Sequence, residues 1–177
     1  MKKLVLLAMA MLLCFAFVSF AGDDEGQVGQ DMAMADAPWF DMPNCDFCKN
    51  LIKDENLLKN MTWENHEIHN GFVSITTVKP EFKAAYMEAM GAMMQLGNDM
   101  ETGKVKPEEV KMCNYCKNYG MLMEAGAKFD YVMGDAAIVT VVTSDNPETL
   151  EKIKKFNERS IMEMAKWEEA EKAKKSE

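Results

Sequence analysis

The sequence predicts an α+β fold, in which a duplicated helix–β-hairpin–helix unit forms a four-stranded antiparallel sheet packed against helices. Two Cys-x-x-Cys pairs, beginning at Cys45 and Cys113, lie 68 positions apart, and each is followed by Lys-Asn. A Pro-Glu step, typical of a helix start, recurs at nearly the same offset, at Pro80 and Pro147. Each half also carries two β-prone segments around a turn sequence. Two such hairpins make four strands, which need helices on one face to bury their apolar side.

The chain opens with the features of a bacterial signal peptide over 1–21. Two lysines precede an uncharged apolar run, 4–20, and Ser19-Phe20-Ala21 has the small-x-small pattern of a cleavage site. We therefore expect cleavage after Ala21 and a periplasmic or secreted protein. An uncleaved anchor is the alternative, because the run is about as long as a membrane span. No later apolar stretch is that long, so we expect no stable membrane span after cleavage.

Residues 22–42 are acidic, with scattered Gly, Ala and Met and no sustained period, which predicts a flexible tether. The two repeats then occupy 43–102 and 103–177. The whole chain carries 20 basic and 29 acidic residues, a formal charge of −9, and loss of the two leader lysines takes this to −11. Arg159 is the only arginine. An acidic, arginine-poor protein is a poor partner for nucleic acid, and its surface suits cations or simple solubility.

The first repeat begins with a predicted helix at about 44–61, whose apolar residues share one face. Next comes the clearest hairpin signal in the chain, an Asn-Gly pair between two β-prone segments, which is typical of a two-residue turn. Pro80 then starts a helix, and Gly103 breaks the linker between the halves. The expected hairpin and second helix occupy 63–69, Asn70-Gly71, 72–79 and 80–100.

The register of this hairpin bears on the two histidines of the chain. With Asn70-Gly71 as the turn, His66 faces Ile75, and we expect it to point toward the helices and the core. His69 then lies near the exposed turn, on the opposite face. His66 is therefore a candidate extra metal ligand or proton carrier, although a half-buried strand histidine with a satisfied hydrogen bond is the favoured interpretation.

The second repeat keeps the same order of elements. A continuous run, 138–142, is β-branched and apolar except for Thr140, which predicts a central strand. Gly126 is a plausible C-terminal cap for the preceding helix. The expected elements are a helix over 107–124, strands over 128–133 and 136–143 joined by Gly134-Asp135, and a helix from Pro147 into the charged tail.

The cysteines carry the functional prediction. Cys14 falls in the leader, so every cysteine of the mature chain belongs to a Cys-x-x-Cys pair. Four thiolates can satisfy tetrahedral Zn(II), and they also bind Cu(I). The alternative is two disulfides, or one cross-link between the halves, in an oxidising compartment. The sequence leaves both interpretations open, a metal site and structural disulfides. The proposed ligands are Cys45, Cys48, Cys113 and Cys116, with His66 as a weaker candidate.

A third interpretation is that the protein is a thiol–disulfide oxidoreductase. Cys45 lies just after Pro43, and a place in the first helical turn would lower its pKa. However, no strand ending in an aromatic residue leads into the motif and no βαβ unit follows, so nothing here is like thioredoxin. The sequence also has no Gly-x-Ser-x-Gly and no glycine-rich phosphate loop. We therefore do not predict an enzyme.

The 18 methionines are the last notable feature. Thioethers suit Cu(I), but methionine is also an adaptable core filler, and packing is the expected role of most of them. Met32, Met34 and Met42 lie in the predicted tether, where there is no core to fill. The sequence thus predicts an exported soft-metal-binding module, with structural Zn(II) first and Cu(I) second. The alternative is a non-catalytic envelope interaction or assembly protein, stapled by disulfides, with a protein partner.

Overall fold

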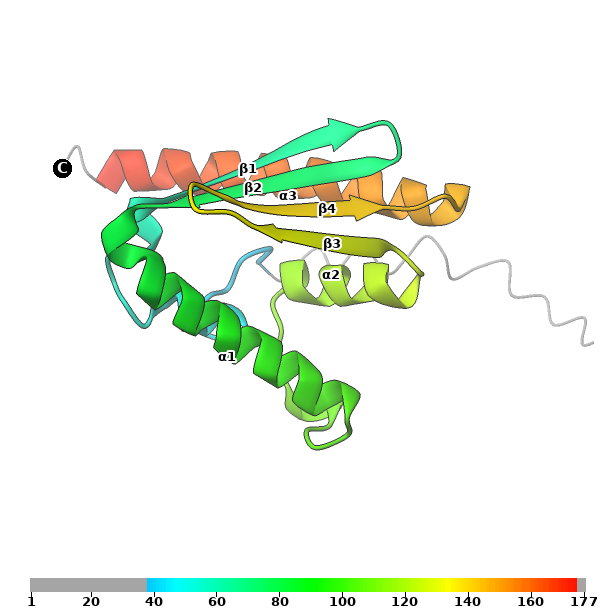
Figure 1. The fold of residues 1–177 in the computed structure, drawn as a ribbon, viewed down its shortest axis with the longest axis horizontal. Coiled ribbons are helices and arrows are strands. Elements are labelled where there is room, and N and C mark those ends of the chain that lie inside the picture. Colours follow the sequence, from blue (N-terminus) through cyan, green and yellow to red (C-terminus); the bar gives the residue numbers. More distant parts are fainter. Residues whose placement is uncertain (1–37, 175–177) are drawn as a thin grey trace, which may run out of the picture. The chain divides into compact units, whose positions relative to one another are not determined.

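One sheet of four antiparallel strands carries helices on one of its faces in the computed structural model, which describes residues 38–174 (Figure 1). The strand order is β1-β2-β4-β3. The longest helix, α3, runs along the sheet and contacts β1, β2 and β4. The strands are β1 Met61–Ile68, β2 Gly71–Val78, β3 Lys128–Met133 and β4 Ile138–Thr143; the helices are α1 Lys83–Glu101, α2 Asn114–Glu124 and α3 Pro147–Lys174.

This architecture confirms the predicted α+β class, the two hairpins and the central place of the β-branched strand β4. A duplicated unit is not confirmed. In each half a hairpin is followed by a helix, but the two Cys-x-x-Cys segments differ, because one forms 3-10 turns and the other leads into an α-helix. The predicted signal peptide and the tether up to residue 37 lie outside the described residues.

The predicted helix over 44–61 is wrong. In its place the chain forms two short 3-10 turns, η1 Cys48–Ile52 and η2 Leu58–Asn60. Polar side chains in this segment bond to the nearby backbone, which competes with helix formation. The Asn50 side-chain amide donates to the carbonyl of Phe47 at 2.9 Å, and the carboxylate of Asp54 accepts from the amide of Asn56 at 2.9 Å. Apolar periodicity therefore indicated burial here but not helix.

The helix of the second Cys-x-x-Cys pair begins later than predicted. Pro107 starts only the 3-10 turn η4 Pro107–Glu109, and α2 begins at Asn114, with Cys113 at its N-cap position. The chain between them is extended at Val110. The predicted cap at Gly126 is confirmed, because this glycine has a φ of 82° and its amide donates to the carbonyl of Met123 at 3.0 Å.

The first hairpin turns one residue earlier than predicted. Ile68 pairs with Gly71, so the two turn residues are His69 and Asn70 and not Asn70-Gly71. Gly71 is the first residue of β2, where a Cβ would overlap the carbonyl oxygen of Val142 on the neighbouring β4. The glycine is therefore required by the close approach of a third strand, a contact that only the assembled sheet creates.

The same register places His66 opposite Val73 instead of Ile75. These side chains share one side of the sheet, as predicted, but the buried side is the other one. Phe72 and Thr76 are buried there, whereas His66 is exposed. The expectation that His66 points into the core is therefore wrong. Alternation along a strand separates the two faces but does not show which of them the helices cover.

The second hairpin also differs from its predicted two-residue turn at Gly134-Asp135. Met133 pairs with Ile138, so the loop has four residues, and the amide of Gly134 donates to the carbonyl of Ala137 at 3.0 Å. β4 consequently begins at Ile138, two residues later than expected. None of the helices in the described part of the chain is both long and apolar enough to cross a membrane.

The buried face of the sheet packs mainly against α3. Phe156 of α3 stacks on Phe72 of β2 with ring centroids 5.9 Å apart, and it also touches Trp39. Trp39 is buried, and Phe40 packs beside it, so these residues belong to the folded body and not to the predicted tether. A second apolar cluster joins the 3-10 segments to α1 and to one end of β4; its buried members are Leu51, Leu57, Tyr86, Ala89 and Ile138.

Asn146 caps the N-terminus of α3. Its side-chain oxygen accepts from the amides of Glu148 at 2.9 Å and Thr149 at 3.2 Å, and Pro147 occupies the first helical position. Replacing Asn146 with alanine should lower the free energy of unfolding by about 1 kcal/mol. Urea unfolding measures this loss. Asn146→Asp is the matched control, because its carboxylate keeps both bonds and complements the helix dipole.

Candidate metal centre

The four cysteines of the two pairs converge at one point of the fold. Cys48 begins η1 and Cys45 lies three residues before it, whereas Cys113 and Cys116 come from the N-terminus of α2. The four sulfur atoms all lie within 4.8 Å of one another. Three close contacts run between the pairs: 3.4 Å from Cys48 to Cys116, 3.6 Å from Cys45 to Cys116, and 3.7 Å from Cys48 to Cys113.

These separations fit a tetrahedral metal site. A metal–sulfur bond of about 2.3 Å gives a tetrahedron whose edges are about 3.8 Å long. A disulfide requires a sulfur–sulfur distance of about 2.05 Å, and all four cysteines are free thiols in the structure. Four soft donors at these distances can therefore hold one metal ion, and the donor set is of the kind that zinc prefers in closed structural sites.

The sulfur cluster is largely shielded from water. Cys45 is fully buried, Cys48 and Cys113 are also buried, and only Cys116 is partly accessible. Met42 packs against the cluster, together with Phe47 and Tyr115. Met42 is one of the three methionines that the sequence singled out; Met32 and Met34 lie outside the described residues. A buried thiol cluster with one accessible sulfur is suited to retaining an ion and less suited to attacking a substrate.

The thiols perturb one another strongly. Hydrogen bonding with Cys113 and then Cys116 lowers the pKa of Cys45 far below its usual value. Hydrogen bonding with Cys113 and Cys45 raises the pKa of Cys116, and burial adds to the rise. Contact with Cys116 lowers the pKa of Cys113 to about 7. Four thiolates cannot share this buried space without a cation, so a metal ion that bound here would displace the remaining protons.

Backbone turns hold each pair of sulfurs. The amide of Lys49 donates to the carbonyl of Cys45 at 2.9 Å, and the amide of Lys117 donates to that of Cys113 at 3.0 Å. In the first pair the amide of Cys48 also donates to the sulfur of Cys45, at 3.5 Å. Such a bond favours the thiolate over the thiol. Each Cys-x-x-Cys therefore forms a closed turn that aims both sulfurs to the same side.

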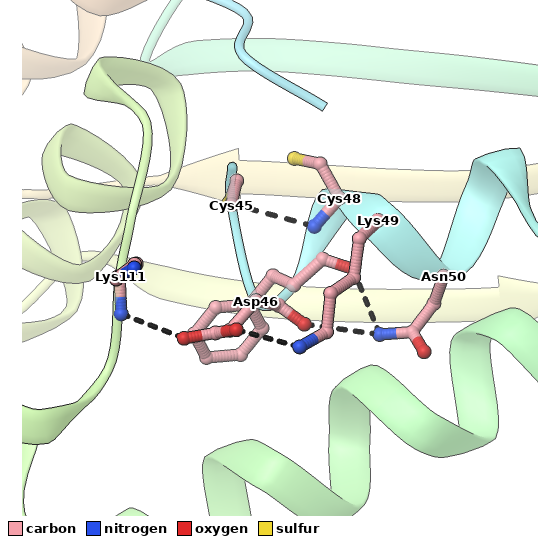
Figure 2. A network of polar contacts seen from close by, with 7 residues as sticks. Cys45, Asp46, Cys48, Lys49, Asn50 and Lys111 are labelled. Carbon is pink, nitrogen blue, oxygen red and sulfur yellow. Dashed lines mark hydrogen bonds and ion pairs between the residues drawn. The ribbon is translucent and has the colours of Figure 1, made fainter. Parts of the chain in front are cut away.

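Asp46, inside the first pair, links the two turns (Figure 2). Its amide donates to the carbonyl of Lys111 at 2.8 Å, and its carboxylate accepts from the amide of Lys111 at 2.7 Å. The same carboxylate pairs with the ammonium of Lys49 at 2.6 Å, and this contact, followed by the Lys111 bond, holds the pKa of Asp46 below its usual range. The sequence analysis missed Asp46 and Lys111. An aspartate between two paired cysteines was the available signal, since its side chain readily bonds to backbone amides.

Tyr115, inside the second pair, anchors the centre to the hydrophobic core. Its amide donates to the carbonyl of Trp39 at 3.0 Å. Its ring contacts five other aromatic rings, with centroids 5.2 to 6.2 Å away: Trp39, Phe40, Trp63, Tyr119 and Phe156. Burial raises the pKa of Tyr115, so the phenol stays neutral. The sequence did not predict this aromatic cluster on the core side, because its members come from four separate stretches of the chain.

His66 is not part of the sulfur cluster. Its side chain is 58% exposed on β1, and its Nε2 lies 3.4 Å from the carboxylate of Glu64. The structure thus brings together the four cysteines named as candidate ligands and leaves the fifth candidate, His66, at the surface.

Comparison with family models, with curated proteins and with solved structures finds no match to this chain. We therefore infer function from the chemistry and geometry of the site.

Proposed function

We propose that this protein is an exported soft-metal-binding module that holds one Zn(II) ion in a structural role. The observation that carries the proposal is the meeting of four free cysteine sulfurs within 4.8 Å, from segments more than 60 residues apart in the chain. Cys45, Cys48, Cys113 and Cys116 are the ligands. The leader-like sequence over 1–21 supports export. The mass of the protein recovered from the periplasm of a bacterial host tests both export and cleavage after Ala21.

Zinc is the first candidate because four thiolates with no open position are typical of structural zinc sites. The ion would supply a bond between the segment at η1 and the start of α2, which lie far apart in the sequence. Cu(I) is the second candidate, and the observation that favours it is the packing of the thioether-bearing Met42 against the sulfurs.

Two other functions have less support. A structural disulfide needs a sulfur–sulfur distance of about 2.05 Å, whereas the sulfurs of Cys48 and Cys116 are 3.4 Å apart. A thiol–disulfide oxidoreductase needs a reactive thiol that a substrate can reach. Cys45 and Cys113, the two thiols whose pKa is lowered, are both buried. We therefore propose no catalytic activity.

Metal reconstitution tests the proposal. The reduced protein should bind one zinc per chain, mask four thiols against a thiol reagent, and release them when a strong chelator is added. Co(II) in place of zinc should show intense thiolate-to-metal charge transfer and the visible bands of a tetrahedral ion, because all four donors are sulfur. The same titration with Cu(I) and with Met42→Leu decides between the two ions.

His66→Ala is the matched control, since His66 lies outside the cluster and its loss should leave stoichiometry and spectrum unchanged. The metal proposal is wrong if the reduced, folded protein keeps four reactive thiols in the presence of excess zinc. A protein purified from the envelope with neither metal nor free thiols would instead favour the disulfide-stapled interaction protein.

A further inference from the structure

We infer that Asp46 is a positioning residue for the metal centre, which holds the two Cys-x-x-Cys turns together and assembles the four-sulfur site before the ion arrives. For the metal itself this inference rests on the proposed function, whereas the approach of the two turns can be measured without any metal. The observation that carries it is a closed ring of bonds between residue 46 of the first turn and residue 111, next to the second.

The ring joins positions that lie close to the ligands. Asp46 directly follows Cys45, and Lys111 lies two residues before Cys113. The amide of Asp46 donates to the Lys111 carbonyl at 2.8 Å, and the Lys111 amide donates to a carboxylate oxygen of Asp46 at 2.7 Å. Both bonds are short and one is charge-assisted, so the ring resists separation of the two segments more strongly than a single neutral bond would.

Every polar atom of Asp46 has a partner. The second carboxylate oxygen accepts from the ammonium of Lys49, and the carbonyl accepts from the side-chain amide of Asn50 at 3.1 Å (Figure 2). The Lys49 contact orients the carboxylate and the Asn50 bond holds the backbone, and both partners lie in η1. Asp46 is therefore held by its own turn while it reaches across to the other one.

Asp46 carries its negative charge directly beside the ligand Cys45. A carboxylate beside a thiolate is unfavourable, because like charges repel. Attraction to the sulfur cluster therefore cannot explain why an aspartate stands here. The bonds can, because one carboxylate oxygen accepts from the Lys111 amide and the other pairs with the ammonium of Lys49.

The consequence for the metal centre is pre-organisation. Two turns that are already in contact lose less freedom when the ion binds, so the ion binds more tightly and leaves more slowly. Groups that orient metal ligands without touching the ion typically change affinity by about 10- to 100-fold when removed. We expect Asp46→Ala to weaken zinc binding by a factor in that range and to speed chelator-triggered zinc release.

Two further variants separate the contribution of the ring to zinc affinity from that of the surface ion pair between Lys49 and Asp46. Asp46→Asn keeps one oxygen that can accept from the Lys111 amide, so it should restore most of the lost affinity. Lys49→Gln removes the ion pair, in which the lysine side chain is half-exposed, but it leaves both bonds to Lys111 in place. This variant should change zinc affinity by less than about threefold, as expected for an exposed pair.

Metal-free cross-linking provides the second readout. Diamide takes two electrons and two protons from a pair of thiols, so that one sulfur–sulfur bond forms and the reagent becomes its hydrazine. In the wild type, sulfurs of different turns lie close together, and those of Cys48 and Cys116 are 3.4 Å apart. Peptide mapping of the zinc-free protein should therefore find disulfides between the turns, and Asp46→Ala should form them at least several-fold more slowly.

The outcomes are distinct. Asp46→Ala with wild-type zinc affinity and wild-type cross-linking rate would overturn the inference. Slow cross-linking in Asp46→Ala together with no zinc binding by the wild type would uphold the ring and refute the proposed function. If Asp46→Ala does not fold, Asp46→Asn and Lys49→Gln decide, because both variants lose the ion pair and keep the bonds to Lys111. Zinc affinity within about threefold of the wild type in both would support the ring, and a loss of about tenfold or more in both would place the contribution in the ion pair and overturn the inference.

Discussion

Replacing Cys48 with serine should abolish tight zinc binding and the stability that zinc confers. The sulfur of Cys48 contacts both cysteines of the other turn, at 3.4 Å and 3.7 Å. Its loss leaves three thiolates and an incomplete tetrahedron, which no longer closes around the ion. We expect bound zinc to fall from about one per chain to near zero after dialysis against a weak chelator.

The stability change follows from linkage. An ion that binds only the folded chain stabilises it by about 4 kcal/mol when free zinc exceeds the dissociation constant a thousandfold. Urea unfolding of the wild type with and without zinc should show an increment of this order, and Cys48→Ser should show almost none. The His66→Ala control should keep the full increment. A Cys48→Ser protein that retains zinc and the full increment would contradict the assignment of Cys48 as a ligand.

Replacing Phe156 with alanine should cause the largest loss of stability among core substitutions on α3. The side chain is 1% exposed, stacks on Phe72, and contacts Trp39, Tyr115 and Tyr119. Truncation removes its buried area and leaves a cavity where these elements meet. We expect the free energy of unfolding to fall by about 3–5 kcal/mol.

Urea unfolding followed by far-ultraviolet circular dichroism measures this loss. Ile161→Ala is the matched control, since it truncates another apolar residue of α3 that is 42% exposed, and it should cost less than about 1 kcal/mol. Phe156→Leu should fall between the two because it keeps much of the buried volume. Equal losses for Phe156→Ala and Ile161→Ala would show that the aromatic cluster does not carry the packing of α3.

The features that depend on local sequence were predictable. Turn residues, β-branched runs and prolines set the backbone conformation of residues close to them in sequence. The α+β class, the two hairpins, the central strand β4 and the cap at Gly126 could therefore be predicted from these patterns. Donor chemistry is local as well, and four cysteines in two pairs indicated a soft-metal site before any distance was known.

The errors have a shared physical cause, which is competition between local preference and distant contacts. The segment over 44–61 has helical periodicity, but Asp46 bonds to Lys111, 65 positions away, and the turns that form instead are not helical. The Asn70-Gly71 turn was displaced because Gly71 lies against the backbone of β4. Neither partner is visible in the local sequence.

The choice of buried face was decided in the same way. Strand alternation put His66 and Val73 on one side and Phe72 on the other, and α3 then covered the Phe72 side, which left His66 at the surface. The sequence by itself determined the kinds of element and the kind of ligand atom. Only tertiary structure decided that the two cysteine pairs meet, at sulfur distances that suit a metal, because bringing together segments so far apart depends on the packing of the whole chain.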